Sequence, residues 1–139
     1  MLTYTIELLS WEFSLDKKKV TYWINEVVNI EKKTITQINY KFISDYELLE
    51  MNKKFLKHDY YTDIITFSEN RGNRLAGDIA ISIPRVEENA RLIKTTFDQE
   101  LKRVIIHGIL HLCGYNDYTQ EEKEIMRKKE SDYLMIYPV

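Results

Sequence analysis

The segment at residues 103–117, RVIIHGILHLCGYND, constrains the fold more than any other part of the chain. Apart from its histidines and Gly108, its middle is apolar, which predicts a helix buried on nearly all sides. His107 and His111 are four residues apart, so their side chains share one face of that helix. Gly114 favours a helix end and a chain reversal, and Asp117 follows three residues later. The fold therefore has to bury a helix that carries two imidazoles.

This arrangement predicts a metal site. Two imidazoles on one helix face can hold one ion, as in H-E-x-x-H zinc sites. The reversal after the helix brings the Asp117 carboxylate back to His107 and His111 as a third ligand. Three protein ligands with a fourth position open are typical of a catalytic zinc site. The alternative is a pair of core histidines, each satisfied by a hydrogen bond, but unpartnered imidazoles on a buried helix would be costly.

Three neighbours of the histidines have other expected roles. Cys113 projects away from both histidines around the helix, so we expect it to pack in the core rather than bind the ion. Arg103 and Glu100 share the histidine face one and two turns earlier. They are candidates for contacting the substrate or orienting a ligand, and an ordinary salt bridge between them is an equal alternative.

The residue after the first histidine distinguishes two reaction classes. An H-E-x-x-H protease has its general base there, and this chain has Gly108. Peptide hydrolysis by that mechanism would lack its proton acceptor. A metal can still lower the pKa of a bound water and polarise a phosphoryl oxygen. These residues therefore favour phosphodiester cleavage over proteolysis.

The composition is that of an ordinary globular protein. With 139 residues, 44% hydrophobic and 30% charged, the chain can bury a core and is not expected to be disordered, so we predict a single domain over residues 1–139. One cysteine excludes an intramolecular disulfide and favours a reducing compartment. The start lacks basic residues and carries Glu7 in its apolar run, which argues against a signal peptide. No stretch has the roughly 20 apolar residues of a membrane helix. We expect a cytoplasmic protein without membrane contacts.

The net charge of −2 argues against a protein that holds nucleic acid by bulk charge. It predicts weak binding to free nucleic acid and allows only a local patch of basic residues. Each basic side chain taken singly is expected on a solvated helix face. The local candidates for phosphate contacts are Lys53, Lys54, Lys57, His58, Arg85, Arg91, Lys94 and Arg103.

Hydrophobic periodicity predicts an α+β fold, with a mixed sheet of about four strands packed with about five helices and the metal site on a late, buried helix. The expected strands are residues 3–9, 34–43, 63–67 and 77–83. The expected helices follow Asp16, Ser44, Thr96 and Thr119, and another begins with Pro84 as its first residue. Asn52 falls on the apolar stripe formed by Leu48, Leu49, Phe55 and Leu56, where it is expected to tie down a neighbouring loop.

The motif H-G-I-L-H-L-C-G-Y-N-D resembles the H-G-x-L-H-L-x-G-Y-D-H signature of the YbeY family. Upstream, Met51-Asn52 through Phe55, followed by Asp59-x-x-Thr62-Asp63-Ile64-Ile65-Thr66-Phe67, resembles the family block L-N-x-x-F/Y-R-x-x-D-x-P-T-D-V-L-S-F. Gly77-Asp78-Ile79 is similar to the family's G-D-I strand. The blocks occur in family order and extend from about residue 45 to 135, so the chain is identified as a member of this family.

The resemblance implies an α+β fold and a zinc-dependent endoribonuclease that matures the 3′ end of small-subunit ribosomal RNA. His107 and His111 match the first two zinc ligands. Asp117 stands where the family has a third histidine, so another divalent metal is possible. Leu56 stands where the family usually has an arginine that meets the substrate, and Lys57 or His58 would have to replace that contact.

The leading hypothesis is therefore a single-strand-specific endoribonuclease in ribosomal RNA maturation and ribosome quality control. His107, His111 and Asp117 would hold one Zn²⁺ per chain and act through its bound water. The substrate-binding candidates are Lys57, His58 and Arg103. Residues expected either to orient ligands and substrate or only to fix turns are Asn52, Thr62, Asp63, Asp78 and Glu100.

The implied partners are ribosomal RNA and the ribosome or its small subunit, together with ribosomal proteins or assembly GTPases. Two alternatives stay open. One is a metal-dependent hydrolase of another substrate, such as a peptide. The other is a ribosome-assembly factor without catalysis, in which the metal only holds the fold.

Overall fold

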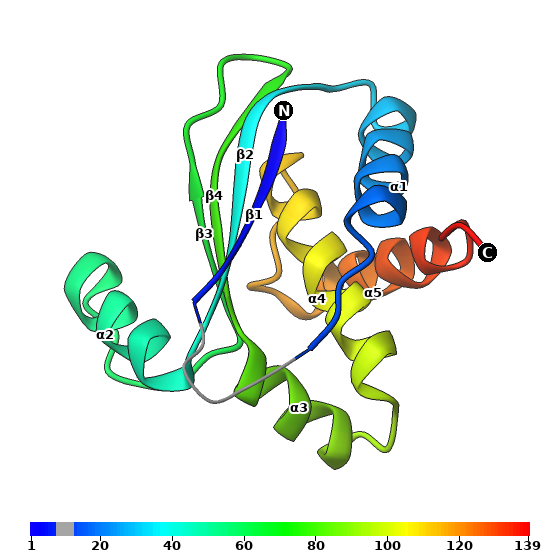
Figure 1. The fold of residues 1–139 in the computed structure, drawn as a ribbon. Helices are drawn as coiled ribbons and strands as arrows, with labels where there is room; N and C mark the ends of the chain where they lie inside the picture. The colour runs from blue at the N-terminus through cyan, green and yellow to red at the C-terminus, as the bar shows by residue number, and fades with distance from the viewer. Residues whose placement is uncertain (8–12) are drawn as a thin grey trace.

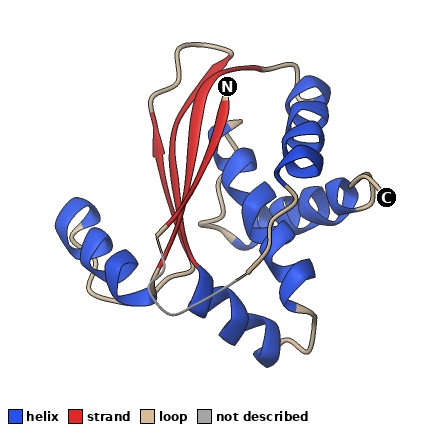
Figure 2. Cartoon of the chain, viewed as in Figure 1, coloured by secondary structure: helices blue, strands red, loops and turns tan. Residues whose placement is uncertain are grey.

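A computed structural model describes residues 1–7 and 13–139 (Figure 1). Four strands and five helices in these residues confirm the predicted α+β class (Figure 2). In chain order they are β1 (Leu2–Ile6), α1 (Lys17–Ile30), β2 (Thr34–Ile43), α2 (Asp45–Leu56), β3 (Ile64–Ser68), β4 (Arg74–Ser82), α3 (Ile83–Leu92), α4 (Phe97–Leu112) and α5 (Gln120–Leu134). No helix in this part of the chain combines the length and apolar character needed to cross a membrane.

The strands form one mixed sheet in the order β1-β2-β4-β3. β1, β2 and β4 run parallel, and β3 is antiparallel to β4 across a hairpin. Ser82 N donates to Asp63 O and Glu69 N donates to Ala76 O, so alternate residues from 63 to 69 bond to β4. The backbone N–H and C=O groups of the residues between them, at 64, 66 and 68, therefore point to the open edge of the sheet.

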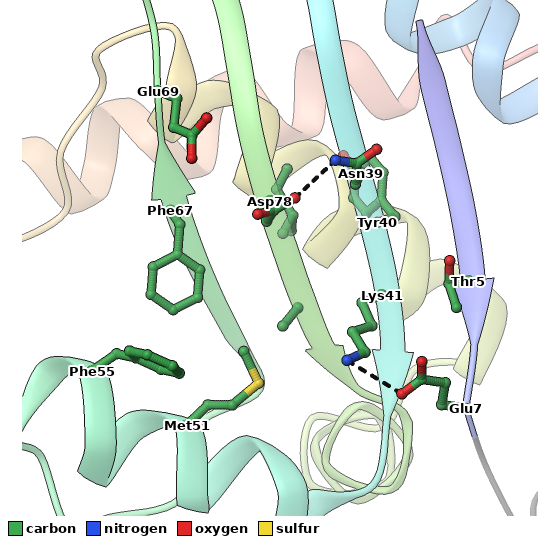
Figure 3. Close-up of a pocket in the computed structure, with 12 residues that line it drawn as sticks. Thr5, Glu7, Asn39, Tyr40, Lys41, Met51, Phe55, Phe67, Glu69 and Asp78 are labelled. Atoms are coloured by element: carbon green, nitrogen blue, oxygen red, sulfur yellow. Dashed lines mark hydrogen bonds and ion pairs between the residues drawn. The ribbon is translucent and has the colours of Figure 1, made fainter.

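One face of the sheet carries most of the core. α1, α4 and α5 lie on this side, and the fully buried Trp23, Phe42 and Ile105 belong to the same apolar cluster. The other face is covered in part by α2, through the buried Leu48. A recess of about 470 Å³ remains there, with polar side chains from three strands along its floor (Figure 3). The helix with the histidines is thus on the well-covered side.

Helix starts agree with the expected capping residues. The side chains of Ser44, Thr96 and Thr119 each accept a hydrogen bond from the backbone N–H three residues later. Thr119 and Glu122 form the complete capping box in which each side chain bonds the other's backbone. One start was predicted wrongly. Ser82 caps α3, which makes Pro84 the second helical residue rather than the first.

Two strand ends and one helix face also differ from the prediction. β1 ends at Ile6, and residues 8 and 9 of the expected strand lie outside the described residues. β4 begins at Arg74, so part of the expected turn is strand. Phe55 and Leu56 are 56% and 41% exposed, although the Phe55 ring packs edge-on against Phe67 of β3 with centroids 5.7 Å apart.

Two glycines allow the backbone to approach closely around the site. A Cβ at Gly108 would lie 3.0 Å from Ile79 Cδ1 and 3.1 Å from Ile64 Cδ1, so its absence lets α4 lie directly on β3 and β4. A Cβ at Gly77, where φ is +154°, would lie 2.0 Å from the backbone oxygen of Phe67. Gly77 thus permits the pairing of β3 with β4 beside the site.

We predict that Gly77→Ala lowers the free energy of unfolding by about 3 kcal/mol or more, because a backbone oxygen has to move. Gly72→Ala is the control, since Gly72 has φ +60° and open space around its Cα. That change should cost only about 1 kcal/mol. Urea unfolding of both variants measures the difference, and equal losses would contradict a tight β3–β4 approach at Gly77.

Candidate metal centre

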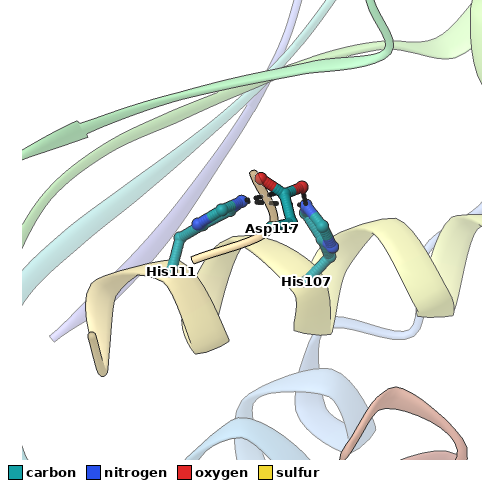
Figure 4. A group of neighbouring side chains, drawn as sticks. All are labelled: His107, His111 and Asp117. Atoms are coloured by element: carbon teal, nitrogen blue, oxygen red, sulfur yellow. Dashed lines mark hydrogen bonds and ion pairs between the residues drawn. The ribbon is translucent and has the colours of Figure 1, made fainter. Parts of the chain in front are cut away.

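The three predicted ligands lie together (Figure 4). His107 and His111 project from the same side of α4, and the chain reverses after the helix at Gly114, where φ is +108°. That conformation is open to glycine and returns Asp117 to the two rings. The Nε2 atoms of the histidines are 3.0 Å apart, and Asp117 Oδ2 lies 3.4 Å from His107 Nε2 and 3.6 Å from His111 Nε2.

The other ring nitrogens fix which atoms face the centre. His111 Nδ1 is 2.9 Å from the backbone oxygen of Tyr115, and His107 Nδ1 is 2.6 Å from Glu130 Oε2. A carbonyl or carboxylate oxygen accepts, so each Nδ1 carries a hydrogen, and the two Nε2 atoms are the ones that face each other and Asp117. When both Nε2 atoms are deprotonated, two nitrogen lone pairs and one carboxylate oxygen converge, which is the form that can bind a metal.

This donor set fits a divalent cation. Tetrahedral coordination with ligand distances of about 2.0–2.2 Å separates ligand atoms by about 3.3–3.6 Å. The observed separations of 3.0, 3.4 and 3.6 Å are close to these values. Two imidazoles and one carboxylate suit zinc, and the carboxylate also suits harder divalent ions. The site can therefore bind a metal, and its donors do not select one metal.

Burial affects the charges at the site. It lowers the pKa of His111, and the neighbouring His107 lowers it further, so the neutral ring that binds a metal is favoured. Burial alone would raise the pKa of Glu130. The hydrogen bond from His107 and the charge of Arg103 outweigh burial and lower that pKa, which keeps the carboxylate ionised. Burial raises the pKa of Asp63, with Arg103 opposing the shift.

Glu130 is the site residue that sequence analysis missed. It lies on α5, is 2% exposed, and accepts hydrogen bonds from both His107 and Arg103. A carboxylate behind a metal-binding imidazole orients the ring and makes it a stronger ligand. One signal in the sequence could have revealed it. Met126, Glu130 and Tyr133 form the buried stripe of a highly charged helix, and an acid on such a stripe requires a partner.

Arg103 and Glu100 form a salt bridge, one of the two alternatives considered. Arg103 Nε and Nη2 donate to the two Glu100 oxygens, both at 2.8 Å, and Glu100 is 2% exposed. Arg103 Nη1 lies 3.2 Å from Glu130 Oε1, and Nη2 lies 3.7 Å from Asp63 Oδ2. The guanidinium therefore holds three carboxylates together behind His107, which raises the pKa of Arg103.

A recess of about 530 Å³ opens beside the three ligands. Its walls include the edge of β3 and several residues singled out in the sequence, and Leu56 also borders it. We call it the aromatic recess because His58, Tyr60 and Tyr118 line it together with Thr62 and Asp63. The His58 and Tyr60 rings stack with centroids 5.2 Å apart, and Tyr118 is 83% exposed.

Two expected residues act on the loop between α2 and β3. Asn52 is 1% exposed and its Nδ2 donates to Tyr60 O at 2.9 Å, which is the loop-fixing role expected for it. Lys57 adopts a left-handed conformation with φ +57° at the end of α2 and is exposed. It is not among the residues that line the aromatic recess.

Three other positions lie away from the ligands. Asp78 is on the opposite face of the sheet, where Asn39 Nδ2 donates to it at 2.9 Å (Figure 3), so it has no contact with the histidines. Cys113 is half-buried against the core, and burial raises the pKa of its thiol to about 11. Gly108 faces the sheet, so no general base occupies the position after His107.

Comparison with known proteins supports a common family. A sequence model of the endoribonuclease YbeY family matches residues 5–137. The chain is 46% identical to an endoribonuclease YbeY from Phocaeicola vulgatus, with 98% of each chain covered. It is 47% identical to one from Parabacteroides distasonis, covering 90% of this chain and 88% of that one. A solved Thermotoga maritima structure is 31% identical, with a TM-score of 0.65, over 94% of this chain and 86% of that chain.

We predict that Glu130→Gln weakens Zn²⁺ binding about 10- to 100-fold, because the neutral amide no longer enhances His107 as a ligand. Competition with a chromophoric chelator measures the affinity, and circular dichroism checks the fold. Glu124→Gln is the matched control, since Glu124 is exposed on the same helix. Equal affinity in wild-type protein and Glu130→Gln would show that His107 does not depend on this carboxylate.

Proposed function

This chain belongs to the endoribonuclease YbeY family, and we propose that it is a metal-dependent endoribonuclease that cuts single-stranded RNA during maturation of the small-subunit ribosomal RNA 3′ end. The observation that carries the proposal is the convergence of His107 Nε2, His111 Nε2 and Asp117 Oδ2, three acceptors within 3.6 Å of one another. Such a group can hold a cation, and a cation beside an open recess suits hydrolysis.

We propose that the ion is Zn²⁺, held by His107, His111 and Asp117, one per chain. When bound, it would supply Lewis-acid chemistry, polarising a phosphoryl oxygen and lowering the pKa of a water molecule. The protein's own residues orient the ligands. Glu130 and the Tyr115 carbonyl hold the two imidazoles, and Arg103 keeps the carboxylates behind His107 in place.

The aromatic recess supports a single-stranded substrate. Bases in a duplex are stacked and paired, whereas bases in a single strand can lie against aromatic side chains. His58, Tyr60 and Tyr118 offer such surfaces beside the metal ligands, and the recess has a volume of about 530 Å³. His58 would contact the base, whereas Lys57 would at most contact the backbone from outside the recess.

Two competing functions have less support. A peptide hydrolase of the H-E-x-x-H type needs a carboxylate after the first histidine, and here Gly108 packs on the sheet. A non-catalytic assembly factor needs only a structural metal, which normally has four protein ligands. The cluster found in the described residues has three protein ligands and borders an open recess.

We further propose that the ribosome or its small subunit presents the RNA strand in the cytoplasm, with ribosomal proteins or assembly GTPases as partners. The net charge of −2 supports this, because long-range attraction to RNA is weak for such a chain. Selectivity would then come from presentation of the strand more than from affinity for free RNA.

We predict that His111→Ala loses bound metal and cuts a single-stranded oligoribonucleotide at least 100-fold more slowly, because one of three ligands is missing. Metal content is measured by mass spectrometry on protein purified without added metal, and cleavage is followed on gels. His58→Ala is the control, which should keep its metal and change mainly KM.

Two outcomes would contradict the proposal. One is a wild-type protein without stoichiometric divalent metal after gentle purification, which would overturn the ligand assignment. The other is a folded, metal-free His111→Ala protein that still supports RNA processing in cells, which would overturn catalysis at this site.

A further inference from the structure

The metal ligands also border two smaller recesses on the α5 side. These have volumes of about 190 and 170 Å³, and His107 and Asp117 line both. Arg103 and Arg127 also line both, Lys123 lines one, and the carboxylates of Asp63 and Glu130, which pair with Arg103, line one each. We call them together the cationic recess. A group bound there would lie beside the same ligands that border the aromatic recess.

The spacing of residues along α5 explains this lining. Lys123 and Arg127 are one turn apart, on the side of the helix that also carries Met126 and Glu130. Met126 and Glu130 are 2% exposed and face α4, whereas Lys123 and Arg127 are exposed. The two cations therefore stand at the rim of a buried interface, directly beside the metal ligands.

Only two of the three cations are available to a ligand. The Arg103 guanidinium is occupied by Glu100, Glu130 and Asp63. Arg127 has a side chain that is 68% exposed, and its Nη1 is 4.0 Å from Glu130 Oε1, at the limit of an ion pair. Lys123 forms no ion pair with any of the described residues.

The two sides of the metal ligands differ in chemistry. The aromatic recess is lined by no lysine or arginine among the described residues, whereas the cationic recess has two available cations. A single RNA strand offers the matching pair of groups, since each nucleotide has a base that stacks on aromatic rings and a charged phosphate. An RNA strand that crosses the metal ligands can therefore place a base in the aromatic recess and a phosphate in the cationic recess at the same time.

We propose that Lys123 and Arg127 bind the RNA phosphate next to the one that is cut, while an unstacked base lies in the aromatic recess. The inference rests on the proposed function. The proposal assigns a phosphate contact to α5. Leu56, at the rim of the aromatic recess, has no charge and cannot make this contact. The basic residues of α2 and α3 that were candidates for phosphate contacts do not line these recesses. Lys53 pairs with Glu50 and Asp59, and Arg85 pairs with Asp45.

The test measures the affinity of metal-loaded protein for a labelled single-stranded 2′-O-methyl RNA, by fluorescence anisotropy over a range of KCl concentrations. The variants are Lys123→Gln, Arg127→Gln and the double variant. Each phosphate contact to a single strand contributes about 0.7 to the slope of log affinity against log salt. Because both side chains bind one phosphate, we expect a slope lower by about 0.7 in the double variant and roughly tenfold weaker binding at low salt, similar for every base sequence.

Controls separate this contact from other effects. Lys128→Gln removes an exposed charge from the same helix, where Lys128 pairs with Asp132 at 3.3 Å, and should leave the slope unchanged. Arg127→Lys should restore most of the affinity because the charge is kept. Metal content should be the same in every variant, since neither side chain is a ligand.

An unchanged slope in the double variant, or an equal fall in Lys128→Gln, overturns the proposal. So does a wild-type protein that fails to bind the strand at low salt. Cleavage of the unmodified strand is measured in parallel. If the wild-type protein binds RNA without cutting it, the ribonuclease activity is refuted, and the salt slopes still decide whether Lys123 and Arg127 hold a phosphate.

Discussion

The approach of two imidazole nitrogens and one carboxylate oxygen to within 3.6 Å of one another is the constraint on which the rest of the structure depends. The atoms are His107 Nε2, His111 Nε2 and Asp117 Oδ2, and their lone pairs favour a proton or a bound cation between them. Keeping them in place requires partners from outside α4. Glu130 on α5 fixes one ring, and the turn after α4 fixes the other through the Tyr115 carbonyl. The candidate metal site therefore depends on the packing of several elements and not on one helix.

Each histidine can be traced to a carboxylate. Glu130 bonds His107 directly, and Arg103 balances its charge. His111 is linked to a carboxylate through Tyr115. The Tyr115 hydroxyl donates to Glu31, at the end of α1, at 2.8 Å, and the Tyr115 carbonyl accepts a hydrogen bond from His111. Tyr133 and Lys129 of α5 bond the same Glu31 carboxylate, so α1, α5 and the turn are joined at one acid. These hydrogen bonds outweigh the effect of burial and lower the pKa of Glu31, which keeps it ionised.

Features set by short stretches of sequence were predictable, and features set by packing between distant segments were not. The i, i+4 histidines, Gly114 and the capping threonines predict α4, the clustering of the three candidate ligands and several helix starts, because each depends on neighbours along the chain. Glu130, Lys123 and Arg127 reach the site only because α5 packs on α4, a contact that no local pattern specifies. Asp78 is on the far face of the sheet, although strict alternation with the buried Ile79 could have indicated its side. Phe55 and Leu56 stay exposed at the end of α2, although the Phe55 ring still contacts Phe67 of β3.

The open edge of β3 gives this site hydrogen-bonding groups of the main chain, which do not depend on the side chains. Along Ile64, Thr66 and Ser68 the wall of the aromatic recess presents main-chain donors and acceptors, since β4 occupies only the other edge of the strand. Every residue type except proline supplies the same N–H and C=O groups. Mutation can change the size and polarity of that wall while its main-chain hydrogen-bonding pattern persists. Sequences can therefore drift at these positions over evolution without losing one set of groups able to meet a substrate.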